Sequence, residues 1–365
     1  MLWLVVLFSV LTCVEGIGFA QSATPLGSGL ADDTGRSRTL GVGALAAPDA
    51  RHGTTTLGPV SGYNRHYVFG YEQSLERAEK KPVDSGATAK QDIQSRRLYG
   101  VFPLVRLPSA NYASGFGILA TARNFSEERK GHEQKLDETK DASLAIQGFL
   151  EVGHWALGAR YHYHRWEGRQ PQMFRINTTP KPTDVPLEVL SRTSIETFQL
   201  AAAYETSEYL RFAIHYVPLI DKIYRPRYLD VNDGPSDRVL PKMRQRIITQ
   251  PEIIAGSASL FIPYSPILAT AGVEHQEIWG EPVGTKTGIA LGLEVNTGFS
   301  IPRMGLTWSK FEDGAARRLG LGSDFVMRSL TLSVDSSISM TNRPKLLGIE
   351  DLSSWEVSVG LGGRI

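Results

Sequence analysis

Runs of about ten residues in which apolar and polar side chains alternate limit the fold of this chain more than any other feature. The run HWALGARYHYHRW, residues 154–166, is an example. Side chains alternate between the two faces of a strand, so its odd and even positions separate cleanly. One face carries Trp155, Leu157, Ala159, Tyr161 and Tyr163, and the other carries His154, Ala156, Gly158, Arg160, His162 and His164. The run therefore predicts a strand with one apolar and one polar face.

The same two-faced pattern recurs at 142–151, 197–204, 209–216 and in the final stretch WEVSVGLGGRI. A soluble β-sandwich also alternates, but its strands average about five or six residues. Runs of about ten residues match tilted strands that cross a membrane. Aromatic side chains such as Trp155 and Tyr163 stand at the ends of the apolar face, where outer-membrane barrels have aromatic girdles. The pattern favours a transmembrane antiparallel β-barrel, and a soluble β protein is the alternative.

The connections alternate between short and long. Short links lie at 205–208, 261–266, 296–298 and 326–328, and long polar segments lie at 75–96, 126–140, 167–192, 218–247 and 340–352. Short periplasmic turns and long external loops are typical of barrels. We predict fourteen strands, near 66–74, 97–107, 112–125, 141–151, 154–166, 193–205, 208–217, 249–261, 266–278, 284–296, 299–310, 316–325, 329–339 and 353–365. Twelve or sixteen are the alternatives, because Pro302 blurs one boundary and 39–60 could add strands.

The N-terminus indicates export. An apolar run from Leu2 to Val14 precedes the small residues Gly18 and Ala20, as in a signal peptide cleaved near Ala20, although the first residues lack Lys and Arg. The run is shorter than the roughly 20 residues of a membrane-spanning helix. Cys13 is the only cysteine, so we expect no disulfide in the mature chain, and a lipid anchor there is the alternative. We predict a signal peptide at 1–20 and a location in the outer membrane of a Gram-negative bacterium.

Residues 21–65 are rich in Gly, Thr and Ala and show no sustained alternation. Such a segment ahead of the first strand is either a disordered leader or a plug. Fourteen strands enclose a bore wider than their own side chains can fill. We therefore favour a plug at 21–65, followed by the barrel at 66–365.

Two parts of the sequence resemble the fatty-acid transporter-like outer-membrane family (FadL, OmpP1 and TodX) and, more loosely, PorV-type barrels. LGVGALAAPDA, residues 40–50, is similar to the Gly/Ala-rich start of that family, with Asp49 at its acidic position. Leu57, Gly58 and Pro59 stand where the family has an Asn-Pro-Ala turn. The closing hairpin, with LGLGSDF and SLTLSVDSS, is also similar.

The resemblance implies passive uptake of small hydrophobic solutes past a plug that contains Asp49, Leu57, Gly58 and Pro59. Likeness to PorV-type barrels implies instead a structural or partner-binding role, exerted through the long loops 167–192 and 218–247. Nothing in the alternation distinguishes these two functions. A barrel hydrolase is a third, weaker alternative.

The polar faces of the strands supply the candidate lumen-facing residues, which are Arg160, His162, His164, Gln199, Arg211 and His215. His162 and His164 would lie about 6.6 Å apart along their strand, but a structural zinc site needs four ligands and no others are marked nearby. Catalytic triads are defined by geometry, which spacing does not reveal. We therefore predict ordinary polar lumen residues, with no catalytic residue, metal or cofactor, and a protein that is not an enzyme.

The net charge and the C-terminal strand indicate which partners to expect. The net charge is +1, which gives no basic excess for nucleic acid. Lys and Arg in 218–247 could attract anionic lipopolysaccharide if that segment is external. The terminal strand has apolar residues at alternate positions and ends at Ile365, where such barrels commonly have Phe. We expect outer-membrane lipid, lipopolysaccharide and the barrel-assembly machinery as partners, besides a hydrophobic solute.

Overall fold

The computed structural model is built from strands alone in the part of the chain that it describes. That part comprises residues 68–82, 89–107, 112–129, 137–176, 183–207, 209–224, 227–229, 246–250, 252–278, 284–311, 314–342 and 349–364. The strands are β1 (Val68–Pro82), β2 (Ala89–Leu107), β3 (Tyr112–Arg129), β4 (Asp137–Val152), β5 (Trp155–Ile176), β6 (Thr183–Glu205), β7 (Leu210–Val217), β8 (Ile220–Tyr224), β9 (Arg227–Leu229), β10 (Arg246–Gln250), β11 (Glu252–Phe261), β12 (Ile267–Ile278), β13 (Gly284–Val295), β14 (Ser300–Phe311), β15 (Gly314–Met327), β16 (Leu330–Asn342) and β17 (Ile349–Arg364). The predicted signal peptide at 1–20 and plug at 21–65 lie outside the described residues.

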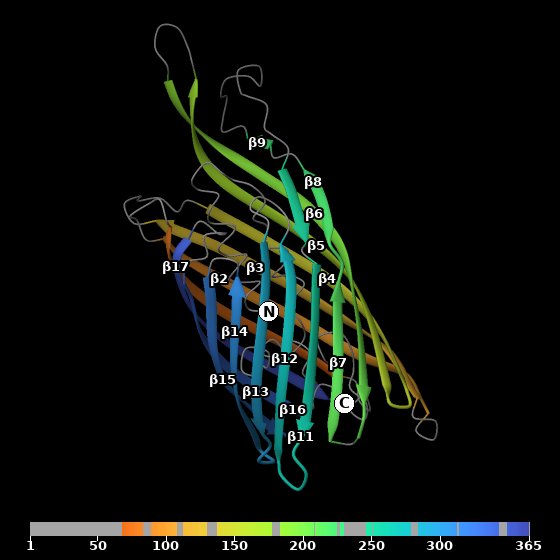
Figure 1. The fold of residues 1–365 in the computed structure, drawn as a ribbon. Coiled ribbons are helices and arrows are strands. Elements are labelled where there is room, and N and C mark those ends of the chain that lie inside the picture. The colour runs from red at the N-terminus through yellow and green to blue at the C-terminus, as the bar shows by residue number, and fades with distance from the viewer. Residues whose placement is uncertain are drawn as a thin grey trace.

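Fourteen of these strands close into a single antiparallel barrel (Figure 1). The wall runs from β1 through β7, continues from β11 to β17, and closes where β17 pairs with β1. The closing ladder extends from Val68 opposite Arg364 to Pro82 opposite Ile349. The predicted fourteen-stranded transmembrane barrel is confirmed, and each predicted segment corresponds to one wall strand. Of the remaining strands, β8 pairs with β10, and β9 pairs with β6.

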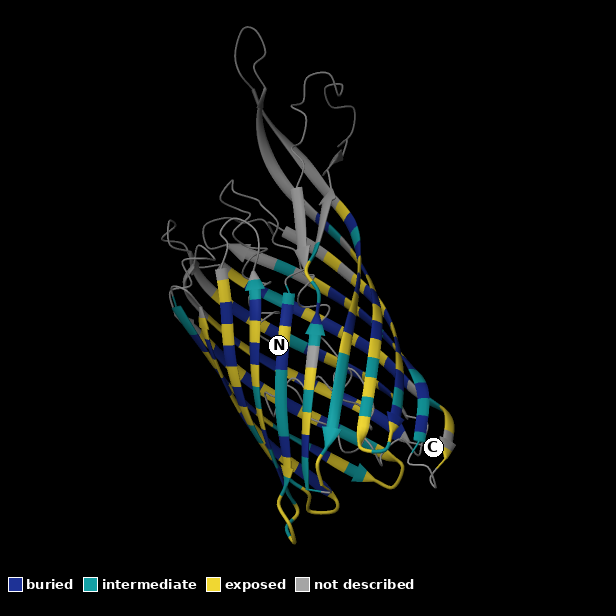
Figure 2. Ribbon diagram, turned by 45° about the vertical axis from the view of Figure 1, so that its right-hand side comes forward, coloured by how far each residue is buried: buried dark blue, intermediate teal, exposed yellow. Residues whose placement is uncertain are grey.

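Burial alternates along the wall strands with period two (Figure 2). On β14, Met304, Leu306 and Trp308 are exposed, whereas the alternate residues Arg303, Thr307 and Ser309 are buried. A soluble barrel would bury the apolar set, so this polarity is reversed. An apolar exterior around a polar interior is the arrangement of a barrel whose outer surface contacts lipid.

Aromatic side chains mark both ends of the apolar exterior. Trp155 and Tyr204 pack at a ring distance of 4.6 Å beside the tight β4–β5 turn. Trp355 lies near the other end of the wall, with the guanidinium of Arg77 over its ring at 5.8 Å. Tyrosine and tryptophan favour the membrane–water interface because one part of each ring system is apolar and another donates hydrogen bonds. The two pairs therefore indicate where the hydrocarbon layer ends.

Short turns join the strands at one end of the barrel, which we call the turn end. Their described residues are 153–154, 206–207, 209, 262–266, 296–299 and 328–329. Gly153 and Gly298 have φ of 61° and 94°, a region that glycine enters without steric cost. The turn end corresponds to the predicted periplasmic side, and we call the opposite end the hairpin end.

At the hairpin end the prediction of long loops was wrong for much of 75–96 and 167–192. β1 continues to Pro82 and β2 begins at Ala89. β5 and β6 remain paired as far as Ile176 opposite Thr183. In β1 and β2 these extensions are rich in charged residues, so the hydrophobic alternation ends while the backbone ladder continues. Period-two hydrophobicity therefore locates the membrane-facing part of a strand and not its full length.

No helix among the described residues is long and apolar enough to cross a membrane.

Replacing Leu306 with Arg should destabilise the folded barrel by about 2–4 kcal/mol, the scale for a cation facing lipid near the bilayer midplane. Leu306 is exposed on the outer face between Leu291 of β13 and Leu319 of β15. Reversible urea unfolding from liposomes would measure the loss. Leu306→Phe is the matched control and should stay close to wild type, so equal losses in the two variants would mean that lipid exposure is not the cause.

Candidate functional site

The interior of the barrel is the candidate functional site, because it gathers most of the buried charged side chains. Seven basic and eight acidic side chains are buried on the inner faces of the described wall strands. They are Arg97, Arg123, Arg160, Arg211, Lys286, Arg303 and Arg318, with Glu72, Glu76, Glu151, Glu274, Glu294, Asp324, Asp335 and Glu356. Buried charge is stable only when it is paired and hydrogen-bonded. The interior should therefore contain ion pairs between strands.

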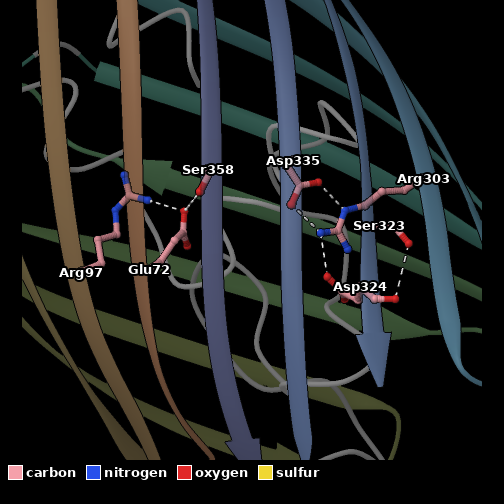
Figure 3. A network of polar contacts seen from close by, with 7 residues as sticks. All are labelled: Glu72, Arg97, Arg303, Ser323, Asp324, Asp335 and Ser358. Atoms are coloured by element: carbon pink, nitrogen blue, oxygen red, sulfur yellow. Dashed lines mark hydrogen bonds and ion pairs between the residues drawn. The ribbon is translucent and has the colours of Figure 1, made fainter. Parts of the chain in front are cut away.

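Arg303 of β14 forms ion pairs with two carboxylates, Asp324 and Asp335 (Figure 3). Its Nε donates to Asp335 Oδ1 at 2.7 Å, and its Nη2 donates to Asp335 Oδ2 at 2.7 Å. The same Nη2 lies 2.8 Å from Asp324 Oδ1. A bidentate arginine–carboxylate pair fixes direction as well as charge. Three strands, β14, β15 and β16, are thus tied together on the inner face.

A glycine between the partners makes this contact possible. Gly322 of β15 stands directly opposite Arg303 on one side and Asp335 on the other. A Cβ added at Gly322 would overlap the Asp335 carboxylate. Because Gly322 carries no side chain, Arg303 and Asp335 can meet across the intervening strand.

Gly322→Ala should therefore displace Asp335 and destabilise the barrel by about 1–3 kcal/mol, the usual cost of overpacking a closely packed site. Gly148→Ala on β4 is the control, because a Cβ there has no neighbouring atom within 4 Å. Unfolding temperature, followed by the loss of heat-modifiable migration on gels, would compare the two variants. A Gly148 variant as unstable as the Gly322 variant would contradict the proposed overlap.

A second cluster joins the first and last strands of the wall. Arg97 Nη1 on β2 donates to Glu72 Oε1 on β1 at 3.0 Å. Ser358 Oγ on β17 donates to the same oxygen at 2.7 Å. Glu72 thus connects β2, β1 and β17 at the seam where the barrel closes (Figure 3).

Four of the predicted lumen-facing residues lie together on neighbouring strands. Arg160, His162 and His164 of β5 and Gln199 of β6 are buried on the inner face, and Gln199 stands opposite Arg160. Arg160 Nη2 donates to Gln147 Oε1 at 2.6 Å. The rings of His162 and His164 are 5.9 Å apart and nearly perpendicular.

The other predicted residues lie apart from this group. Arg211 is buried near the turn end, where its Nη2 lies 2.7 Å from Glu205 Oε1. His215 stands on β7 opposite Ala201 and Ala255, and its side chain is outside the described part of the structure. Asp49, Leu57, Gly58 and Pro59 are also outside the described residues. Among the residues that are described, no three His, Cys, Asp or Glu side chains are grouped so as to hold a metal ion.

Solved structures share this architecture along nearly their whole length. A Pseudomonas aeruginosa FadL homologue matches with a TM-score of 0.60 at 12% identity, covering 91% of this chain and 97% of its own. This chain has a FadL-type fold. The Ralstonia pickettii toluene transporter TbuX gives a TM-score of 0.61 at 11% identity, covering 92% and 99%. The Pseudomonas putida toluene transporter TodX gives 0.58 at 8% identity, covering 91% and 98%.

The resemblance found in the sequence is thus confirmed at the level of the fold. No protein-family model and no curated protein sequence matches the chain. Because these solved structures are only 8–12% identical to this chain, they show its fold but do not assign roles to its residues. The residues of this FadL-type barrel must therefore be interpreted from their own contacts.

Sequence reasoning missed both ion-pair clusters and one apolar patch. Tyr99, Leu119, Ala145 and Phe149 form a buried apolar cluster on the inner faces of β2, β3 and β4. The alternation along 299–310 already places Arg303 on the inner face. Its partner Asp335 requires the register of three strands, which no single-strand pattern provides.

Proposed function

We propose that the protein is an outer-membrane channel for passive uptake of small hydrophobic solutes. The observation that carries this proposal is the closed barrel of fourteen strands with an apolar exterior and a FadL-type fold. Two of its structural relatives are described as toluene transporters. A channel of this kind acts by binding and release and needs no catalytic residue.

The buried apolar cluster Tyr99, Leu119, Ala145 and Phe149 supports a hydrophobic solute. Most of the inner face is polar, so an apolar molecule would gain little by contacting it. Two aromatic rings and a leucine on three adjacent strands offer the kind of surface that apolar ligands bind. This cluster is the part of the interior that best suits such a solute.

The proposal includes residues 21–65 as a plug. Fourteen strands enclose more space than wall side chains fill, yet Gln199, Arg160 and His164 are at most 2% exposed. A segment that packs against the inner face would account for part of this burial. The proposed plug, residues 21–65, precedes β1 and is long enough to do so. Lipopolysaccharide around the wall, and the assembly machinery acting on β17, remain part of the proposal as partners.

Toluene uptake by cells that express the protein tests this function. Expression should accelerate entry of radiolabelled toluene over a strain that carries the empty vector, and deletion of residues 22–65 should raise the passage of small solutes further. The control is the same barrel with Leu306→Arg, which should assemble poorly and give little uptake. Equal entry with and without well-assembled barrel would contradict the channel.

A partner-binding barrel is the second candidate, favoured by the length of the β5–β6 hairpin. Its ladder extends from Trp155 opposite Tyr204 to Ile176 opposite Thr183, and it projects beyond the other strands at the hairpin end (Figure 1). A hairpin whose strands are paired along their length offers an ordered surface to which another protein can bind. Purification from membranes with a stoichiometric second protein, lost on removing 168–190, would support this function, whereas normal toluene uptake by that variant would favour the channel.

A further inference from the structure

The ladder between β6 and the strand that follows it is interrupted at the hairpin end. β6 pairs with β7 from Leu200 to Glu205, and it pairs with β9 from Glu188 to Leu190. Between these two ladders, residues 191–199 of β6 form no described ladder on this side. The strand β8 lies near this part of β6 and instead pairs with β10.

The registers show that β7, β8 and β9 follow one path along β6. β7 pairs with β11 and β8 pairs with β10 in a single continuous register, with Val217 opposite Ile253 and Ile220 opposite Gln250. At the two ends of this path, β7 and β9 each pair with β6. Pro218 directly follows β7, and Pro226 separates β8 from β9 in the sequence. Proline has no N–H to donate, so these positions interrupt a ladder. β8, between them, retains its N–H groups.

Residues 191–199 of β6, which form no described ladder with β8, lie at the edge of the apolar exterior. On the outer face of β6, Leu200 and Phe198 are apolar and exposed, whereas Glu196 and Arg192 are polar and exposed. Unpaired backbone groups cost several kcal/mol each in hydrocarbon. Side-chain polarity and backbone pairing therefore agree that the gap opens to water, beyond the lipid tails.

The inner side of the gap faces part of the candidate site. Ile195 and Thr197 of β6 are buried on the inner face, directly opposite His164 and His162 of β5. A solute that entered between β6 and β8 would reach these histidines without passing along the axis of the barrel.

We propose that β8 is a strap that closes onto β6 and opens again, and so controls access to the His162 and His164 face from the hairpin end. Continuing the β6–β7 register places Ile220 opposite Glu196 in the closed state. One edge of β8 stays paired with β10 throughout, so closure adds a ladder without breaking one. The control of uptake rests on the proposed channel function, but the movement of the strap does not.

Disulfide formation tests the strap. The test variant is Glu196→Cys with Ile220→Cys, and the matched control is Arg165→Cys with Ser194→Cys, two residues that are paired in the β5–β6 ladder. Cys13 is the only native cysteine and lies in the predicted signal peptide, so the background is low. Under mild oxidation the control should cross-link at once, and the test pair should cross-link completely but more slowly.

Three results would overturn the strap or its role. No cross-link at 196–220 means that β8 is held away from β6, and a rate equal to the control means that the two are permanently paired. The third result uses toluene uptake, which should be lost when 196–220 is oxidised and return on reduction. Unchanged uptake in the oxidised, cross-linked protein would mean that β8 does not control solute access. Absence of toluene uptake in the wild type would refute the channel, and the cross-linking rates would still decide whether the strap moves.

Discussion

Deletion of Gly360–Ile365 should abolish insertion of the barrel into the membrane. These residues of β17 pair with Val68–Glu72 of β1 on one side and with Leu330–Ser333 of β16 on the other. Their loss would open the wall at its closing seam and expose backbone groups on two strands to lipid, at several kcal/mol for each group. The measurement is the fraction of heat-modifiable protein in isolated outer membranes, which should fall to background.

Ile365→Phe is the control for this deletion, because it leaves the paired residues of β17 unchanged and keeps an apolar side chain at the end. It should insert as well as wild type or better. Normal heat-modifiable protein from the truncated gene would show that the end of β17 is dispensable for closure.

Sequence alternation was sufficient to predict the wall because lipid imposes a strict rule on each strand separately. Leu306 must face outward and Thr307 inward whatever the neighbouring strand is. The rule ends at the membrane boundary. Beyond it, β5 and β6 continue as a hairpin to Ile176 and Thr183. Prolines at 171, 180, 182 and 186 interrupt the sequence pattern of that segment. The predicted loop at 167–192 failed for that reason.

The candidate site was predictable only in part, because its contacts depend on register between strands. The alternation of 154–166 alone places Arg160, His162 and His164 on one face. The meeting of Arg303 with Asp335 needs the offset of β14 to β15 and of β15 to β16, together with a glycine at the crossing. No pattern within one strand contains that information. The gap between β6 and β8 is likewise visible only once the ladders are known.

Replacing Arg303 with Met should destabilise the barrel by about 3–5 kcal/mol, the scale for breaking a buried ion pair from one side. The loss arises because Asp335 and Asp324 would remain buried without the guanidinium that neutralises them. Their carboxylates would have to be protonated or hydrated for the strands to stay closed. Equilibrium unfolding in urea from liposomes at neutral pH would measure the difference.

The control removes all three charges at once, as Arg303→Met with Asp324→Asn and Asp335→Asn. Replacing a whole buried charge cluster by hydrophobic residues of similar volume is often close to neutral in stability, and the Asn amides used here keep the volume of the carboxylates while removing their charge. The triple variant should therefore recover most of what the single variant loses, and acidification should help the single variant more than the triple one. If the single and triple variants unfold at the same urea concentration, then the hydrogen bonds of the Arg303 guanidinium, and not its neutralisation of the two carboxylates, hold β14, β15 and β16 together.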